Sequence, residues 1–190
     1  MELEDLRKKI LSCERCPLRR FATRPVPGEG SKNASLMLVG EAPGREEDLL
    51  GRPFVGRAGK LLRRVILENL GIKDVYITNV VKCRPPRNRT PKWEEMITCG
   101  VYLDEEIRIV RPKTIVALGR VASAYLLGKK DVKIGRIRGK ILYTNRTGIR
   151  IPMIPTYHPA AALRNPTLID LIKEDIKKAY EISRSHDLEI

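Results

Sequence analysis

Four cysteines are the residues of this chain whose type and spacing most clearly predict chemistry. Cys13 and Cys16 form a C-x-x-C pair, and Cys83 and Cys99 follow much later, with fifteen residues between them. A C-x-x-C pair can place two thiolates on one metal centre, but the wider second spacing fits a zinc ribbon poorly. An iron–sulfur cluster bound by four thiolates fits better. We rank the interpretations as cluster first, then zinc, then two disulfides.

Disulfides rank last because nothing before Cys13 resembles a secretion signal. Residues 1–5 look like the start of an amphipathic helix, whereas disulfides belong mainly to secreted proteins. The longest apolar runs have the length of strands, so no membrane span is predicted. We therefore expect a cytoplasmic protein in which the metal clasps residues 13–16 to residues 83–99, away from any catalytic centre.

Three polar side chains lie in or just after predicted strands and are the candidates for catalysis or binding. Glu41 comes after an apolar run that Gly40 ends, Asn79 lies in the β-forming run 75–81, and His158 follows the run 151–157. In parallel α/β sheets, ligands bind beyond the carboxyl ends of the strands. The sequence therefore predicts a polar cleft at that edge of the sheet.

The elements that must position these side chains alternate between strands and helices. Strands are predicted at 35–39, 75–81, 114–118 and 151–157, and helices at 2–12, 61–70, 91–110, 120–127 and 168–180. This alternation predicts an α/β sandwich with a central, mostly parallel four-stranded sheet. At 190 residues we expect a single domain, 1–190, with a metal-clipped N-terminal segment.

The charge of the chain predicts a polyanionic partner, with nucleic acid as the first candidate. The formal net charge is +14, from 37 Lys+Arg against 23 Asp+Glu. The excess is concentrated in two stretches, one with Lys82, Arg84, Arg87, Arg89 and Lys92 and the other with Lys129, Lys130, Lys133, Arg136, Arg138 and Lys140. The charged fraction of 32% and the absence of Gln are typical of a protein from a hot habitat.

Taken together, these motifs resemble the family 4 uracil-DNA glycosylases. The resemblance rests on Gly40-Glu41-Ala42-Pro43-Gly44, Asn79, His158-Pro159-Ala160-Ala161 and the four cysteines, and it covers nearly the whole chain. It implies a three-layer α/β/α fold, a [4Fe–4S] cluster on the cysteines, and a nucleoid-associated DNA repair enzyme. The implied reaction removes uracil that arises from cytosine deamination.

The resemblance also implies which residues bind uracil. Gly40, Glu41 and Ala42 would line the pocket, Phe54 would stack on the flipped base, and Asn79 would accept from uracil N3–H and donate to O4. Read without the resemblance, Phe54 could equally anchor the core, and Asn79 could be a satisfied structural amide.

Further roles follow in the same way for the acidic residues and for the segment after the last strand. Glu47 would stand against uracil C5 and exclude thymine, although an acidic helix start is its ordinary interpretation. His158 would donate to uracil O2, and Glu41 would position water and stabilise the sugar cation. Residues 160–166 resemble a DNA-entering loop, in which Leu163 would be the wedge and Arg164 a phosphate contact; a core-facing Leu163 is the alternative.

Two other functions stay open at this level. One is a family 5 type glycosylase with a broader base range, and the other is a non-catalytic iron–sulfur module that binds DNA. The preferred enzyme would lack a lysine nucleophile and would leave an abasic site in an uncut strand. We expect a monomer. A sliding clamp is a candidate partner for which the sequence contains no visible motif.

Overall fold

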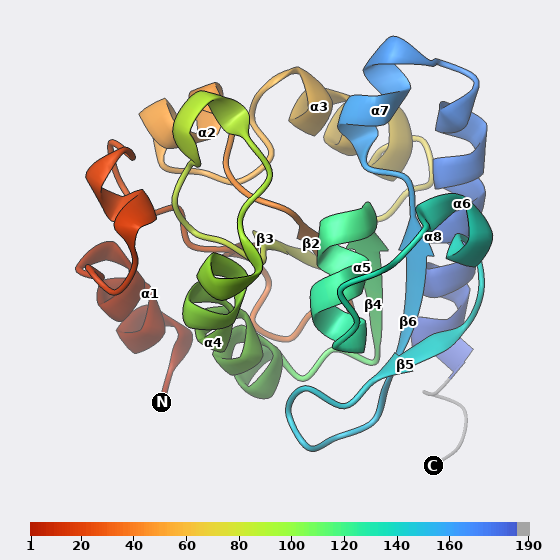
Figure 1. Cartoon of the computed structure of the whole chain (residues 1–190). Coiled ribbons are helices and arrows are strands. Elements are labelled where there is room, and N and C mark those ends of the chain that lie inside the picture. The colour runs from red at the N-terminus through yellow and green to blue at the C-terminus, as the bar shows by residue number, and fades with distance from the viewer. Residues whose placement is uncertain (186–190) are drawn as a thin grey trace.

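A six-stranded mixed sheet forms the centre of the molecule in the computed structural model, which describes residues 1–185 (Figure 1). The strand order is β1-β3-β2-β4-β6-β5, and the four inner strands run parallel. The strands are β1 (Glu29–Gly30), β2 (Leu36–Gly40), β3 (Val75–Asn79), β4 (Thr114–Leu118), β5 (Leu142–Thr144) and β6 (Ile151–Thr156). The predicted four-stranded sheet is therefore right for its parallel centre, but two short antiparallel edge strands extend it.

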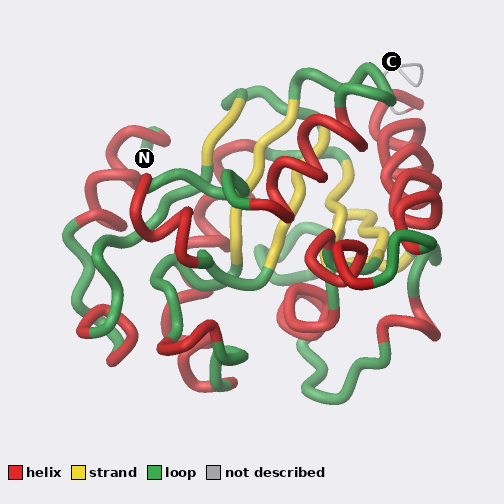
Figure 2. Tube along the Cα trace, turned by 90° about the horizontal axis from the view of Figure 1, so that it is seen from above, coloured by secondary structure: helices red, strands yellow, loops and turns green. Residues whose placement is uncertain are grey.

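Helices cover both faces of the sheet, which gives the predicted three-layer sandwich (Figures 1 and 2). One face packs against α4 (Trp93–Val110) and α5 (Arg120–Leu127), and α1 (Leu3–Leu11) lies against α4. The other face packs against η2 (Leu61–Leu67) and α8 (Leu168–Ser185). Strands buried on both faces must be apolar along their whole length, which is why the inner strands appear in the sequence as continuous apolar runs.

The remaining helices are short and are η1 (Pro17–Arg20), α2 (Arg45–Leu50), α3 (Arg57–Lys60), η3 (Pro86–Asn88), α6 (Ile134–Ile137) and α7 (Pro159–Arg164). Two of the predicted segments differ from expectation. Residues 159–164 form a helix where a loop was predicted, because Pro159 suits a first helical turn and His158 caps it. The predicted helix 61–70 instead contains a π-helix, η2, a rare element found often at functional sites.

Within residues 1–185, no helix is both long enough and apolar enough to cross a membrane.

Candidate active site and cysteine centre

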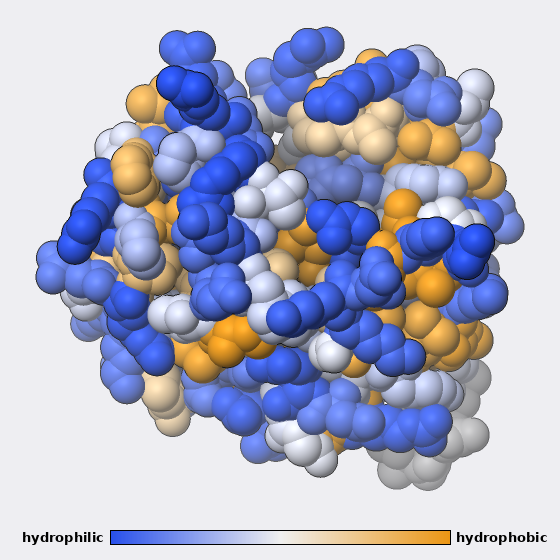
Figure 3. All heavy atoms as spheres, viewed as in Figure 1, coloured by the Kyte–Doolittle hydropathy of each residue, from blue (hydrophilic) through white to orange (hydrophobic). Residues whose placement is uncertain are grey.

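A cleft of about 690 Å³ opens at the carboxyl ends of the parallel strands. It brings together most of the candidates, namely Glu41, Ala42, Glu47, Phe54, Asn79, His158 and Arg164. On the space-filling surface this edge is hollowed between the loop with residues 85–90 and α7 (Figure 3). The predicted position of the site is therefore where the structure has its cleft.

Gly40 brings the amide and the aromatic ring of the cleft together. Its strand pairs in parallel with β3, so that Gly40 stands directly opposite Asn79. A Cβ on Gly40 would lie 2.5 Å from Asn79 Oδ1 and 2.5 Å from Phe54 Cζ, both far inside van der Waals contact. Only glycine therefore allows both side chains to approach the end of β2.

Asn79 ends strand β3 with its side chain almost completely buried, at 2% exposure. Its Oδ1 has no hydrogen-bond partner among the described residues. A buried acceptor without a partner is costly, and native proteins rarely retain one without a use for it. No described protein group therefore satisfies this oxygen, which is available to a ligand, and the uracil contact of Asn79 stays a prediction.

The backbone around Phe54 is held in a strained conformation by two features of the fold. Phe54 has φ +53°, which is uncommon for a residue with a side chain. Gly59 approaches so closely that a Cβ there would lie 2.0 Å from the Phe54 carbonyl carbon. Arg63, on η2, donates to the Phe54 and Pro53 carbonyls at 2.9 and 2.8 Å and pairs with Glu29. Strain held by the surrounding structure is typical of functional sites.

Glu47 lies in the cleft and ties two loops together. Its carboxylate accepts hydrogen bonds from the backbone N–H groups of Gly44 at 3.0 Å, Val55 at 2.9 Å and Gly56 at 2.6 Å. The residue thus caps α2 and also fixes the chain just after Phe54. The predicted contact with uracil C5 stays a prediction, and the loop clamp is a role that the sequence did not indicate.

His158 is positioned as a neutral hydrogen-bond donor. Its Nδ1 accepts from the backbone N–H of Ala160 at 3.0 Å, so the proton of the neutral ring is on Nε2. Burial lowers its pKa to about 4, and the nearby Glu47 carboxylate opposes this only in part. The ring stacks against Phe54 at 5.7 Å between centroids. The other histidine, His186, lies outside the described residues.

Glu41 follows directly on β2 and lines the cleft. Burial raises the pKa of its carboxyl, while the charge of Arg120 on α5 acts in the opposite direction. Val81 N–H donates to the Glu41 main-chain carbonyl at 3.1 Å, which fixes the backbone, and the hydrogen bonds within residues 1–185 include none to the Glu41 carboxylate. The influence of Arg120 on Glu41 was not predicted, and Arg120 is not among the residues that line the cleft. Its only signal was its place directly after the strand-ending Gly119.

The two proposed DNA contacts both lie on α7. The Leu163 side chain is 38% exposed, so the core-facing alternative is wrong, and Arg164 lines the cleft. In contrast, one member of the first basic stretch does not reach the surface, because Lys82 is only 1% exposed and pairs with Glu106. Lys82 is therefore removed from the predicted DNA-binding set. Its place directly before Cys83 was the only sequence signal that it differs from its basic neighbours.

The four cysteines surround one small internal cavity, although they come from distant parts of the chain. None of the four forms a disulfide. Backbone N–H groups donate to two of the sulfurs, from Arg15 to Cys13 Sγ at 3.4 Å and from Lys82 to Cys99 Sγ at 3.1 Å. Burial and the neighbouring thiols raise the pKa of Cys83 to about 12.

The arrangement of the four thiols suits a cluster better than a single metal ion. Among residues 1–185, no three His, Cys, Asp or Glu side chains converge tightly enough to hold a single metal ion. Four thiols around a shared cavity, with N–H donors to sulfur, suit a cluster that takes one thiolate per iron. The residues therefore fit a [4Fe–4S] cluster, which stays a prediction, and the disulfide interpretation is wrong.

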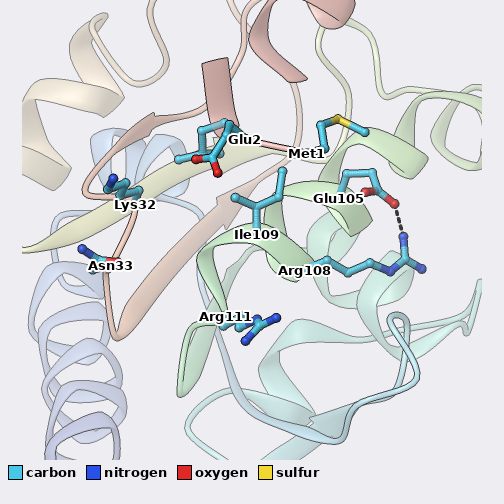
Figure 4. Close-up of a pocket in the computed structure, with 9 residues that line it drawn as sticks. Met1, Glu2, Lys32, Asn33, Glu105, Arg108, Ile109 and Arg111 are labelled. Carbon is cyan, nitrogen blue, oxygen red and sulfur yellow. Dashed lines mark hydrogen bonds and ion pairs between the residues drawn. The ribbon is translucent and has the colours of Figure 1, made fainter. Parts of the chain in front are cut away.

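A second depression lies beside the segments that lead into the amino ends of β2 and β4, and Figure 4 shows the side chains that line it. Its volume is about 440 Å³, and it lies between the N-terminal residues, Lys32, Asn33 and the end of α4. Glu105 and Arg108 on its wall pair with each other. None of the candidate residues lines it, so it is not the predicted site.

Comparison with known sequences identifies the family. The profile of the Uracil DNA glycosylase superfamily matches residues 27–182. The chain therefore belongs to this superfamily.

Its relatives define the group more narrowly. The chain is 47% identical to the Type-4 uracil-DNA glycosylase of Saccharolobus solfataricus, over 94% of this chain and 85% of the relative. It is 45% identical to that of Archaeoglobus fulgidus, over 95% and 92%. Identity to the Type-5 uracil-DNA glycosylase of Pyrobaculum aerophilum is lower, at 33% over 83% and 82%. The type-4 resemblance is confirmed.

Proposed function

We propose that this chain is a DNA repair enzyme that excises uracil from DNA by hydrolysing the N-glycosidic bond. Membership in the superfamily and the type-4 relatives support this activity. The observation that carries the proposal is the Oδ1 of buried Asn79, which has no hydrogen-bond partner within residues 1–185 and lies in a cleft shared with His158 and Phe54. This is the acceptor that uracil N3–H requires, and cytosine has no proton at N3 to donate.

Base recognition would begin with flipping, because a base stacked in a duplex cannot reach the Asn79 side chain, which is only 2% exposed. The residues of the two basic stretches other than Lys82 would hold the phosphates. The exposed Leu163 would fill the gap that the flipped base leaves in the duplex. Phe54 would then stack on the uracil ring, while the Asn79 amide reads its N3–C4 edge. The clamp by Glu47 and Arg63 keeps the loop of Phe54 in place before the base arrives.

Bond cleavage puts negative charge on uracil O2 and positive charge on the sugar. The Nε2–H of neutral His158 would donate to O2, where a prepositioned donor contributes about 3–4 kcal/mol to transition-state stabilisation. Glu41, close to the end of β2, would stabilise the sugar cation and orient the attacking water. No lysine is among the described residues that line the cleft. Without an amine nucleophile, the product is an abasic site in an uncut strand.

The cysteine centre would hold a [4Fe–4S] cluster through Cys13, Cys16, Cys83 and Cys99. It would clasp the N-terminal segment to the segment that follows β3 and supply stability rather than a chemical step. We also propose that the enzyme works as a monomer inside the cell, on nucleoid DNA and at high temperature. Light scattering of the purified chain tests this oligomeric state through its molar mass.

The activity is tested with labelled duplexes that differ in one base, uracil, cytosine, thymine or hypoxanthine. We expect release of uracil only, with strand breaks appearing only after alkali treatment. Release of hypoxanthine as well would support the broader type-5 range. Tight DNA binding without release of any base would overturn the proposal in favour of a non-catalytic module.

A further inference from the structure

A completely buried ion pair lies directly behind the residue that reads the base. Lys82 and Glu106 are 1% and 0% exposed, and Lys82 Nζ lies 2.5 Å from Glu106 Oε1. Taking two charges out of water costs several kcal/mol per ion, and attraction between them offsets this only in excellent geometry. A buried pair of this kind is therefore weak evidence that it stabilises the fold. A role in holding neighbouring groups in position is the alternative.

The ammonium of Lys82 uses all three of its donors. It donates to Glu106 Oε1, to Thr78 Oγ1 at 2.8 Å and to the main-chain carbonyl of Asn79 at 2.6 Å. Glu106 is equally well satisfied, since it also accepts from Tyr76 Oη at 2.7 Å and Thr78 Oγ1 at 2.8 Å. The network is complete, and one of its contacts is the backbone of Asn79 itself.

The main chain of Lys82 is anchored as firmly as its side chain. Its N–H donates to Cys99 Sγ at 3.1 Å, and its carbonyl accepts from Val26 N–H at 2.7 Å. Lys82 thus starts from a fixed point beside the cysteines and reaches back across three residues to the end of β3. Val80 N–H, between the two, donates to the Gly40 carbonyl at 3.0 Å.

The hydrogen bond from Lys82 to the Asn79 carbonyl is important because the Asn79 side chain itself is weakly anchored. Oδ1 of that side chain has no partner in the described part of the chain, so no hydrogen bond to this oxygen sets the direction of the amide. Two constraints on this side chain are the Asn79 backbone, which Lys82 contacts, and the close approach of Gly40. Lys82 holds that backbone through the Asn79 carbonyl.

We propose that Lys82 is a positioning residue of the glycosylase. Through the Asn79 carbonyl it fixes the end of β3, and through that it fixes the amide that selects uracil. The inference rests on the proposed uracil excision and adds to it a residue outside the cleft.

The test must separate positioning from stability, because Lys82→Met alone leaves Glu106 charged and unpaired in the core. We therefore combine Lys82→Met with Glu106→Gln, which removes both charges and keeps an acceptor for Tyr76. The double variant should recover most of the melting temperature lost in Lys82→Met. It should nevertheless release uracil about 10- to 100-fold more slowly in single turnover, since small misplacements at a reacting centre have effects of this size.

Two further readouts would not move if Lys82 were merely structural. Inhibition by free uracil should weaken by a similar factor, because the amide that binds the base is misplaced, while affinity for abasic DNA should stay within about two-fold. Iron per chain, measured in every variant, should equal that of the wild type. The matched control is Tyr76→Phe, which removes another contact of Glu106 but none of Asn79, and it should lower the melting temperature with little change in rate.

The outcomes are distinguishable. A double variant with the wild-type rate and uracil inhibition overturns the inference, and so does a Tyr76→Phe variant that is slowed equally. A loss of iron in the double variant that accounts for the slower rate also overturns it. A wild-type chain that releases no uracil overturns the proposed function, and the inference falls with it.

Discussion

Replacing Gly40 by alanine should disable the cleft with the smallest possible chemical change. The new Cβ would lie 2.5 Å from both Asn79 Oδ1 and Phe54 Cζ, about 0.9 Å closer than an ordinary contact of 3.4 Å. Because the new Cβ is too close to both atoms at once, at least one of the two side chains must move by nearly 1 Å. A displacement of this size at a reacting centre costs about 100-fold in rate.

The variant should still fold, since forcing one methyl group into a packed region costs about 1–3 kcal/mol. Gly40 does not have a positive φ, so its backbone accepts alanine. We would measure single-turnover uracil release and the melting temperature together. The matched control is Gly135→Ala, where the nearest atom to the new Cβ is a Tyr157 oxygen at 3.5 Å. A Gly40→Ala variant as fast as the wild type would refute the packing argument.

Three further changes test separate parts of the site. His158→Ala should slow single-turnover release by about two to three orders of magnitude with DNA affinity within a few-fold, and collapse of binding at an unchanged rate would contradict this. Because its folded pKa of about 4 lies below its unfolded value, the wild-type rate should be constant above about pH 5, and stability should fall as pH drops from 6.5 towards 4. Arg63→Met should loosen the Phe54 loop and slow uracil release about ten-fold. Arg52→Met, which changes the exposed partner of the same Glu29, should leave the rate unchanged. Equal rates in the two variants would contradict the role of Arg63 in holding this loop. Cys99→Ala should lose the brown colour, the broad absorbance at about 400 nm and thermal stability; stoichiometric zinc without iron in the wild type would refute the cluster prediction.

Much of the scaffold could be predicted because burial on both faces leaves a simple signal. The inner strands are continuous apolar runs, and Glu41 and His158 stand where two of them end; Asn79 lies within the predicted run 75–81, and the structure ends β3 at this residue. Parallel strands bring their carboxyl ends to one edge, so these three residues had to lie near one another. The edge strands β1 and β5 were not predicted because two or three residues carry no periodicity.

The parts that could not be predicted depend on contacts between distant residues. Lys82 looks like one more member of a basic stretch, and only the fold shows that Glu106, 24 residues away, draws it inside. Glu47 looks like an ordinary acidic helix start until Val55 and Gly56 are seen to donate to it. In each case the deciding partner is a backbone or side-chain group whose position follows only from the packed structure.

The central claim, that the Asn79 amide selects uracil, is tested most directly by Asn79→Asp. Single-turnover release would be measured for this variant and the wild type on duplexes that contain uracil or cytosine at the same position. The account predicts that the wild type releases only uracil, and that the variant loses most uracil release and gains some release of cytosine, since a protonated carboxyl can donate to cytosine N3. Uracil release at the wild-type rate in the variant would contradict it and leave Asn79 with a structural role.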